Sequence, residues 1–108
     1  MGNRPLRFDW DEAKNESNIL RHGIDFADAY RMFAFHMMVD LDDREDYGET
    51  RYIGIGVLDE LLATVVFTEP DEDTIRVISL RRATRYERQQ YEAYLQDRLG
   101  QIADDERR

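Results

Sequence analysis

A histidine and a group of arginines are the side chains of this sequence whose types and positions suit chemistry. Histidine is the side chain best suited to proton transfer near neutral pH, and His22 precedes Gly23, which allows the backbone to turn close to a ligand. A histidine in this position can carry a proton, or it can satisfy the free carbonyl groups and the dipole at the end of a helix. The sequence leaves both interpretations open.

Arginines are concentrated between residues 76 and 98. This segment holds six arginines and three acidic residues, a local charge of +3 in a chain whose net charge is −9. Arg81, Arg82 and Arg85 lead from a predicted strand into the first turn of a predicted helix, where backbone amides and the helix dipole add to the attraction for an anion. We predict a phosphate site there. The alternative is that the arginines of the helix are solvated and paired with Glu92.

Four further side chains are candidates for the same site. Lys14 is the only lysine and lies two helical turns before His22, so both can face one side of a helix. Arg51 and Arg76 fall on predicted strands and could project onto a shared face, or they are surface arginines without a role. Asn18 precedes His22 by four residues and could orient its ring.

Several other kinds of site are excluded by composition and spacing. The absence of cysteine removes disulfides, thiolate catalysis and thiolate metal sites. Residues 40–43 begin like a calcium loop, but Glu45 stands where that loop needs glycine and Arg51 where it needs glutamate. His22 and His36 lack the spacing of a zinc site. We expect no cofactor and no required metal, with a weak magnesium site in the acidic stretch as the alternative.

The elements that must position these residues begin with a short strand at residues 7–8 and two helices. Asp9 and Glu12 have the spacing of a capping box, which predicts the start of the first helix, and Gly23 supplies its left-handed end. Asp25 can cap the second helix. The predicted core-facing stripes are Trp10, Ala13, Ser17 and Leu20 on the first helix and Phe26, Ala29, Tyr30 and Phe33 on the second.

An antiparallel meander of about four strands should follow. The predicted strands are the apolar runs 36–39, 51–57, 61–68 and 74–80, with turns at residues 59–60 and 70–73. Glycines alternate with apolar residues in the second run, which indicates a face that is closely approached. The last run is apolar on both faces, so helices should cover both sides of the sheet. The acidic stretch 40–49 is predicted to be a solvated loop.

A C-terminal helix closes the chain. Thr84 and Glu87 form a second capping box, Gly100 is predicted to end the helix early, and residues 103–108 are predicted to fray. Its apolar stripe is Tyr91, Tyr94, Leu95, Leu99 and Ile102. No linker divides the chain, so we expect one α+β domain over residues 1–108 with a core at about 6–102. No apolar run approaches the roughly 20 residues of a membrane helix, which predicts a cytoplasmic protein without a membrane partner.

A longer pattern runs through most of the chain. Its first half consists of Phe8-Asp9-Trp10-Asp11, Lys14, Asn18, Arg21-His22-Gly23-Ile24, Phe26, Ala29 and Phe33. Its second half consists of Arg51-Tyr52-Ile53-Gly54, Val65-Val66-Phe67-Thr68-Glu69, Ile75-Arg76-Val77-Ile78-Ser79, Arg81-Arg82-Ala83-Thr84, Glu87, Arg88 and Tyr91. Over residues 8 to 91 this pattern resembles the BrnT family of toxins in order and spacing.

The resemblance implies a fold similar to RelE-type ribonucleases, with two N-terminal helices, an antiparallel sheet and a C-terminal helix. It also implies a type II toxin, an endoribonuclease that cleaves RNA and inhibits translation. Its implied partner is a BrnA-like ribbon-helix-helix antitoxin. The toxin would reach operator DNA only when bound to this antitoxin. The acidic stretch would then dock a basic antitoxin segment, away from Arg81 and Arg82.

RNA can be cut without metal if one group takes the 2′-OH proton, another protonates the leaving 5′ oxygen, and cations stabilise the charge on phosphorus. The predicted catalytic residues are His22, Arg81 and Arg82. The predicted substrate-binding residues are Lys14, Arg51, Arg76 and Arg85. The net charge of −9 opposes general attraction to RNA. Two alternatives therefore stay open, a catalytically silent antitoxin-binding module of the same fold and an acidic mimic of nucleic acid.

Overall fold

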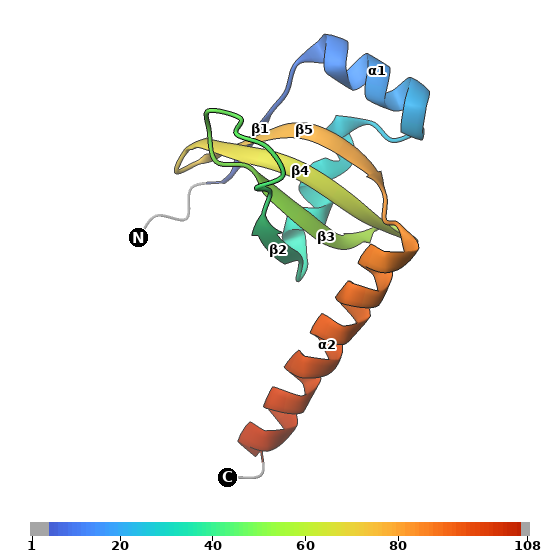
Figure 1. Cartoon of the computed structure of the whole chain (residues 1–108), viewed down its shortest axis with the longest axis vertical. Coiled ribbons are helices and arrows are strands. Elements are labelled where there is room, and N and C mark those ends of the chain that lie inside the picture. The colour runs from blue at the N-terminus through green and yellow to red at the C-terminus, as the bar shows by residue number, and fades with distance from the viewer. Residues whose placement is uncertain (1–4, 107–108) are drawn as a thin grey trace.

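Five strands form one sheet in the computed structural model, which describes residues 5–106, with side chains to residue 101 (Figure 1). The strands are β1 (Arg7–Asp9), β2 (Met38–Leu41), β3 (Tyr52–Leu58), β4 (Leu61–Asp71) and β5 (Thr74–Arg82). Their order across the sheet is β1-β5-β4-β3-β2, and only the β1–β5 pair is parallel. The predicted meander is therefore present, with one strand more because β1 joins it at the edge of β5.

The central strand β4 is longer than predicted. The turn at residues 59–60 is confirmed, since β3 ends at Leu58 and β4 begins at Leu61, with Asp59 at φ 54°. The turn predicted at residues 70–73 is present but shorter, at residues 72–73, because β4 continues through Pro70 to Asp71. Its pairing with β5 is irregular between Thr68 and Asp71, and proline, which lacks an N–H, is tolerated where a ladder is broken.

One face of the sheet packs on the short helix η1 (Phe26–Ala34), and we call it the η1 face. η1 is a 3₁₀ helix with three residues per turn, so its buried residues are every third one, Phe26, Ala29 and Met32. The α-helical stripe predicted here is wrong in part, because Tyr30 is 54% exposed. Asp25 is the cap, as predicted, and accepts a hydrogen bond from the Ala27 amide at 2.9 Å.

The glycines of β3 leave room for a side chain on the η1 face. A Cβ atom at Gly54 would lie 2.7 Å from Met37 Sδ, and one at Gly56 would lie 3.3 Å from Met37 Cγ. The close approach predicted from the alternating glycines is confirmed, and the neighbour is a methionine that precedes β2.

The opposite face we call the loop face. Its residues, from the strand register, are Ile53 and Ile55 of β3, Thr64, Val66 and Thr68 of β4, and Ser79 and Arg81 of β5. Helices reach both sides of the sheet, as predicted, but on the loop face the last helix covers only part of the strands. Its residues Glu87 and Gln90 line a hollow there with Ile53 and Ile55. The residues between β2 and β3, 42–51, form a loop beside the rest of this face.

The first helix, α1 (Glu12–His22), lies beside the edge of β5 (Figure 1). Its cap is Asp11, which accepts hydrogen bonds from the Ala13 and Lys14 amides, whereas the predicted cap, Asp9, belongs to β1. The predicted apolar stripe is wrong apart from Trp10, which precedes the helix and packs against the core. The residues of α1 that are buried are Asn15 and Asn18. Ala13, Ser17 and Leu20 are exposed, and Leu20 is 88% exposed.

Asparagines are buried in α1 because the helix meets backbone rather than apolar side chains. The Asn18 amide donates to Leu80 O at 2.8 Å and accepts from Leu80 N at 3.3 Å, as a neighbouring strand would. Asn15 accepts from the Phe26 amide at 2.9 Å. Gly23, at φ 72°, ends the helix as predicted.

The last helix, α2 (Arg85–Glu106), extends away from the sheet (Figure 1). Its capping box is confirmed, since the Thr84 amide donates to Glu87 and the Glu87 amide donates to Thr84. The predicted end at Gly100 is wrong, because this glycine does not adopt a left-handed conformation and the helix continues to residue 106. The tail predicted to fray from residue 103 is thus helical to 106, and residues 107–108 lie outside the described part. In that described part, no helix is both long and apolar enough to cross a membrane.

Candidate functional site

A hollow of about 270 Å³ lies between α1, β5 and the start of β3, and we call it the α1 hollow. Its charged and hydroxyl-bearing lining residues are Lys14, Ser17, Arg21, His22, Arg51 and Ser79. Lys14, Ser17 and Arg21 are three, four or seven residues apart, so they form one face of the helix, and His22 lies beside this face, two turns after Lys14. Among the described residues that line it, none is acidic. The hollow is therefore suited to an anion although the whole chain is acidic.

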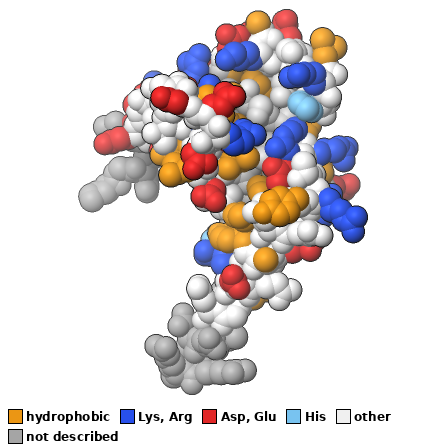
Figure 2. All heavy atoms as spheres, viewed as in Figure 1, with side chains coloured by type: hydrophobic (Ala, Val, Ile, Leu, Met, Phe, Trp, Pro, Cys, Tyr) orange, Lys and Arg blue, Asp and Glu red, His pale blue; other side chains and the backbone are white. Residues whose placement is uncertain are grey.

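Figure 2 shows the same feature on the molecular surface. Lys and Arg side chains gather around a histidine over α1 and the start of α2, while acidic side chains gather beside them. Charges farther apart than the Debye length, about 8 Å at physiological salt, are largely screened from one another. A cationic patch and an acidic remainder can thus coexist on one small protein.

The structure brings together Lys14, His22 and Arg51 of the predicted site residues. Arg21 was missed, although it lies seven residues after Lys14, and this spacing was a usable signal. Asn18 does not orient His22, because both its amide hydrogens are used by the carbonyl oxygens of Ile24 and Leu80. Asn18 fixes α1 to β5 instead.

Arg51 reaches the hollow from the end of the 42–51 loop. Its guanidinium carbon lies 3.9 Å from the centre of the Tyr47 ring, and its side chain is 22% exposed. Arg51 Nε is buried and has no hydrogen-bond partner. Thr68 Oγ1, on the neighbouring strand, is also buried and without a partner. Two polar atoms on this part of the loop face are thus left without an internal hydrogen bond.

Arg76 lies elsewhere. The register pairs it with Thr68, so it shares the loop face with Arg51, as predicted. Its guanidinium, however, donates to Asp9 at 3.1 Å and lines a separate hollow with Arg7 and Asp71. The structure therefore does not bring Arg76 into the α1 hollow.

At the corner between β5 and α2, the first arginine, Arg81, is bound in an internal ion pair. Arg81 donates to both carboxylate oxygens of Glu87, at 2.7 and 2.9 Å. Burial raises the pKa of Glu87, but hydrogen bonds from Arg81, from the Thr84 amide and from Thr64 outweigh it and lower the pKa to about 2. Arg81 is thus held in an ion pair that is mostly buried, with side chains 26% and 12% exposed.

Arg82 and Arg85 are exposed and have no ion-pair partner within the described residues. Successive strand residues point to opposite faces, so Arg82 does not converge with Arg81. The dense arginine segment of the sequence therefore spreads over the surface at this corner.

Metal ligands do not converge in the described part of the chain, where no group of three or more His, Asp or Glu side chains could hold an ion. The acidic loop uses one of its carboxylates internally. Asp42, predicted to be solvated, is buried and bonded to Arg44 at 2.7 Å.

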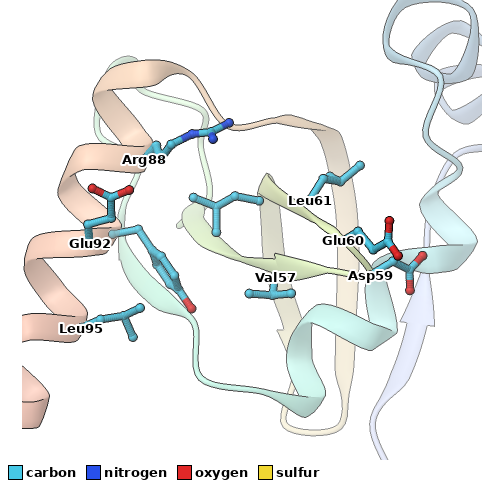
Figure 3. A pocket seen from close by; sticks show the side chains of 9 residues that line it. Val57, Asp59, Glu60, Leu61, Arg88, Glu92 and Leu95 are labelled. Atoms are coloured by element: carbon cyan, nitrogen blue, oxygen red, sulfur yellow. The ribbon is translucent and has the colours of Figure 1, made fainter.

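A further hollow, of about 350 Å³, lies between α2 and the β3–β4 hairpin, and we call it the α2 groove (Figure 3). In Figure 3, Leu95 of α2 lies across from Val57 and Leu61 of the hairpin. Its charged lining residues are Asp59, Glu60, Arg88 and Glu92. This groove is apolar with a mainly acidic rim, which does not suit a phosphate.

The fold and the α1 hollow together define a small α+β protein with a cationic site beside the edge of its sheet. Residues 10–87 match the family model described as the ribonuclease toxin BrnT of type II toxin–antitoxin systems. The chain belongs to this family, which confirms the resemblance seen in the sequence and implies an antitoxin partner.

A solved structure agrees with this assignment. The crystal structure of the Brucella abortus ribonuclease toxin BrnT is 28% identical to this chain, with a TM-score of 0.58. The match covers 74% of this chain and 99% of that one. A comparison with curated proteins finds no match. The family model ends at residue 87, so it includes every residue of the α1 hollow but little of α2.

Proposed function

We propose that this chain is a metal-independent endoribonuclease that cleaves RNA in the cytoplasm, inhibits translation and is neutralised by an antitoxin. The α1 hollow is the observation that carries the proposal. It places a histidine among Lys14, Arg21 and Arg51, with no acidic side chain in its described lining. These are the groups that metal-free cleavage of RNA needs, a proton carrier and cations for the phosphate.

The proposed roles follow from the geometry. In this proposal His22 serves as both base and acid: it takes the 2′-OH proton as the 2′ oxygen attacks phosphorus, and it gives a proton to the 5′ oxygen as the P–O5′ bond breaks, which yields a 2′,3′-cyclic phosphate and a 5′-OH end. Lys14, Arg21 and Arg51 hold the phosphate and stabilise its developing charge. Arg81 supports the site through its ion pair with Glu87.

The exposed cations outside the hollow have a lesser role in this proposal. Arg82 and Arg85, which are exposed at the β5–α2 corner, contact the RNA backbone beside the cleavage site. Arg76 reaches RNA only when its contact with Asp9 opens.

The test is incubation of the purified protein with RNA in EDTA, with and without ribosomes. We expect cleavage that leaves cyclic phosphate ends and is lost in His22→Gln. A control, Gln96→Ala, changes an exposed residue of α2 away from the hollow and should cleave normally. Absence of cleavage by the wild type under every condition would contradict the proposal and favour the catalytically silent module.

For the partner we propose a BrnA-like ribbon-helix-helix antitoxin that binds the α2 groove and carries the toxin to operator DNA. The groove supports this by its chemistry. Val57, Leu61 and Leu95 offer an apolar floor, while Asp59, Glu60 and Glu92 give the rim an acidic character despite Arg88. A segment with apolar side chains flanked by Lys or Arg complements such a surface.

Co-expression with the antitoxin encoded beside the toxin gene tests the groove. Val57→Lys and Leu95→Lys should abolish the complex on size exclusion, because each places a charge on the apolar floor. Leu99→Lys is the matched control, since it lies one turn further along α2 and is 65% exposed. A complex that survives both groove substitutions would place the antitoxin elsewhere.

A further inference from the structure

We infer that the acidic 42–51 loop is part of the ribonuclease site, in which Asp42 and Tyr47 are positioning residues that hold Arg51 ready for a phosphate of the RNA. The inference rests on the proposed function. It assigns a role to a segment whose carboxylates alone would only repel RNA.

Asp42 anchors the loop. Its side chain is 1% exposed and accepts two hydrogen bonds from Arg44, at Nε (2.7 Å) and Nη2 (2.8 Å). The Tyr47 hydroxyl donates to the same carboxylate at 3.4 Å, and the Asp42 amide donates to Arg51 O at 2.8 Å. The hydrogen bond from Arg44 holds the pKa of Asp42 below its ordinary value although burial opposes it. Asp42 therefore ties the start of the loop to its centre through its ionised carboxylate and to its end through its backbone amide.

Tyr47 then sets the direction of Arg51. The guanidinium lies over the ring at 3.9 Å, a distance at which a cation and an aromatic face attract each other. Its closest carboxylate contact is Glu49, at 3.9 Å from Nε, and Nε has no hydrogen-bond partner. The ring therefore contributes most of what orients the side chain, and it does so without using the N–H groups that a phosphate needs.

The position of Arg51 makes this orientation useful. The backbone at its end of the loop is fixed by the ladder to β2 through Asp42, and its side chain lines the α1 hollow with Lys14 and His22. A long arginine side chain loses rotamer freedom when it binds, so a side chain that is already ordered binds a phosphate more tightly. Tyr47 acts on substrate only through Arg51.

Two substitutions separate the ring from the hydroxyl. Tyr47→Leu removes the aromatic face, whereas Tyr47→Phe keeps the face and loses only the bond to Asp42. The matched control is Tyr30→Leu, because Tyr30 is also a partly exposed tyrosine beside an arginine, Arg31 at 5.8 Å, and does not line the α1 hollow.

The first measurement is independent of catalysis. The Nε–Hε resonance of Arg51, assigned by comparison with Arg51→Lys, should carry a ring-current shift in the wild type. We expect Tyr47→Leu to remove this shift and Tyr47→Phe and Tyr30→Leu to keep it. An Arg51 resonance that does not respond to Tyr47→Leu would overturn the inference.

The second measurement is affinity for a short 2′-O-methyl RNA, which cannot be cleaved by its own 2′ oxygen. Tyr47→Leu should weaken binding about 5- to 10-fold, the range of one cation–π contact. In an Arg51→Gln background the same change should have no further effect, because the two residues act as one unit. If the affinity losses of Tyr47→Leu and Arg51→Gln instead add in the double variant, Tyr47 does not act through Arg51. That result would show a general structural effect and refute the positioning role. A wild type that binds with this coupling but cleaves nothing would instead refute the proposed ribonuclease.

Discussion

Two arginine-bearing regions of this protein differ in what their local sequence predicts and in what they assemble. The β5–α2 corner has the densest cluster of arginines, yet Arg81 is bound to Glu87 and Arg82 points to the other face of the strand. The α1 hollow draws single cations from separate elements, among them Lys14 and Arg51, and brings them around His22. Convergence in space, rather than density along the chain, creates the anion site.

The largest expected effect is on the rate of RNA cleavage, which should depend on the α1 hollow and not on the β5–α2 corner. His22→Gln should lower the rate of RNA cleavage about 100- to 1,000-fold, the usual contribution of a general acid or base. Arg82→Gln should change it less than about 3-fold, because that side chain is exposed and is not among the described residues that line the hollow. Initial rates on one fluorescent RNA would measure both, and the reverse ranking would return the chemistry to the corner.

The β5–α2 corner should instead affect the stability of the fold and its dependence on pH. Glu87 has a pKa of about 2 in the folded protein against an ordinary value of 4.5. A carboxyl group with a depressed pKa stabilises the fold fully above its unfolded pKa and loses that effect as the pH falls from about 4.5 towards 2. The loss amounts to about 3 kcal/mol, since one pKa unit corresponds to about 1.4 kcal/mol.

Urea unfolding at pH 6 and pH 3 would measure this effect. Arg81→Gln should unfold at lower urea at pH 6 and show a smaller difference between the two pH values. Glu92→Gln, which removes an exposed carboxylate from the same helix, is the control and should behave as the wild type. An unchanged pH dependence in Arg81→Gln would mean that the ion pair does not stabilise the corner.

A third effect concerns the docking of α1 on β5 through Asn18, which keeps the α1 hollow in shape. Asn18→Ala frees the backbone amide and carbonyl of Leu80, and we expect a loss of about 2 kcal/mol in the free energy of unfolding with reduced cleavage. Leu20→Ala, on the exposed side of the same helix, should stay within about 0.5 kcal/mol of wild type. Equal losses in the two variants would contradict the docking of α1 through Asn18.

The smallest effect should come from the exposed cations of the corner. Arg82→Gln and Arg85→Gln should each weaken binding of uncleavable RNA only slightly, and each should lower the slope of log affinity against log salt by about one. Affinities at several salt concentrations would show it. A slope that does not change would exclude these residues from the RNA path.

Local patterns predicted the strands and the caps because those depend on neighbours in the sequence. The hairpin at Asp59, the capping box at Thr84 and the glycine end of α1 all appear as expected. The family resemblance, which depends on many spaced residues, is confirmed by the match to residues 10–87. What failed were the cap of α1 at Asp9, the end of α2 at Gly100 and the choice of buried face on both N-terminal helices.

Those faces could not be predicted because they depend on what each helix meets. Asn15 and Asn18 are buried since α1 contacts backbone groups of β5 and η1, a partner that apolar periodicity does not describe. Met32 replaces Tyr30 in the core because η1 has three residues per turn. The pairing of Arg81 with Glu87, six residues apart, arises only when the strand turns into the helix.

Asn18 also determines how this sheet can grow. A strand at the edge of a sheet offers unpaired N–H and C=O groups to any other chain, which is a route to aggregation. Along β5, β1 pairs with residues 74–76 and the Asn18 amide occupies both backbone groups of Leu80. Within the described residues β2 forms the other edge, where Val39 and Leu41 are 47% and 59% exposed. Strand addition between copies would therefore begin at β2, and the side of the sheet that carries the α1 hollow is protected from it.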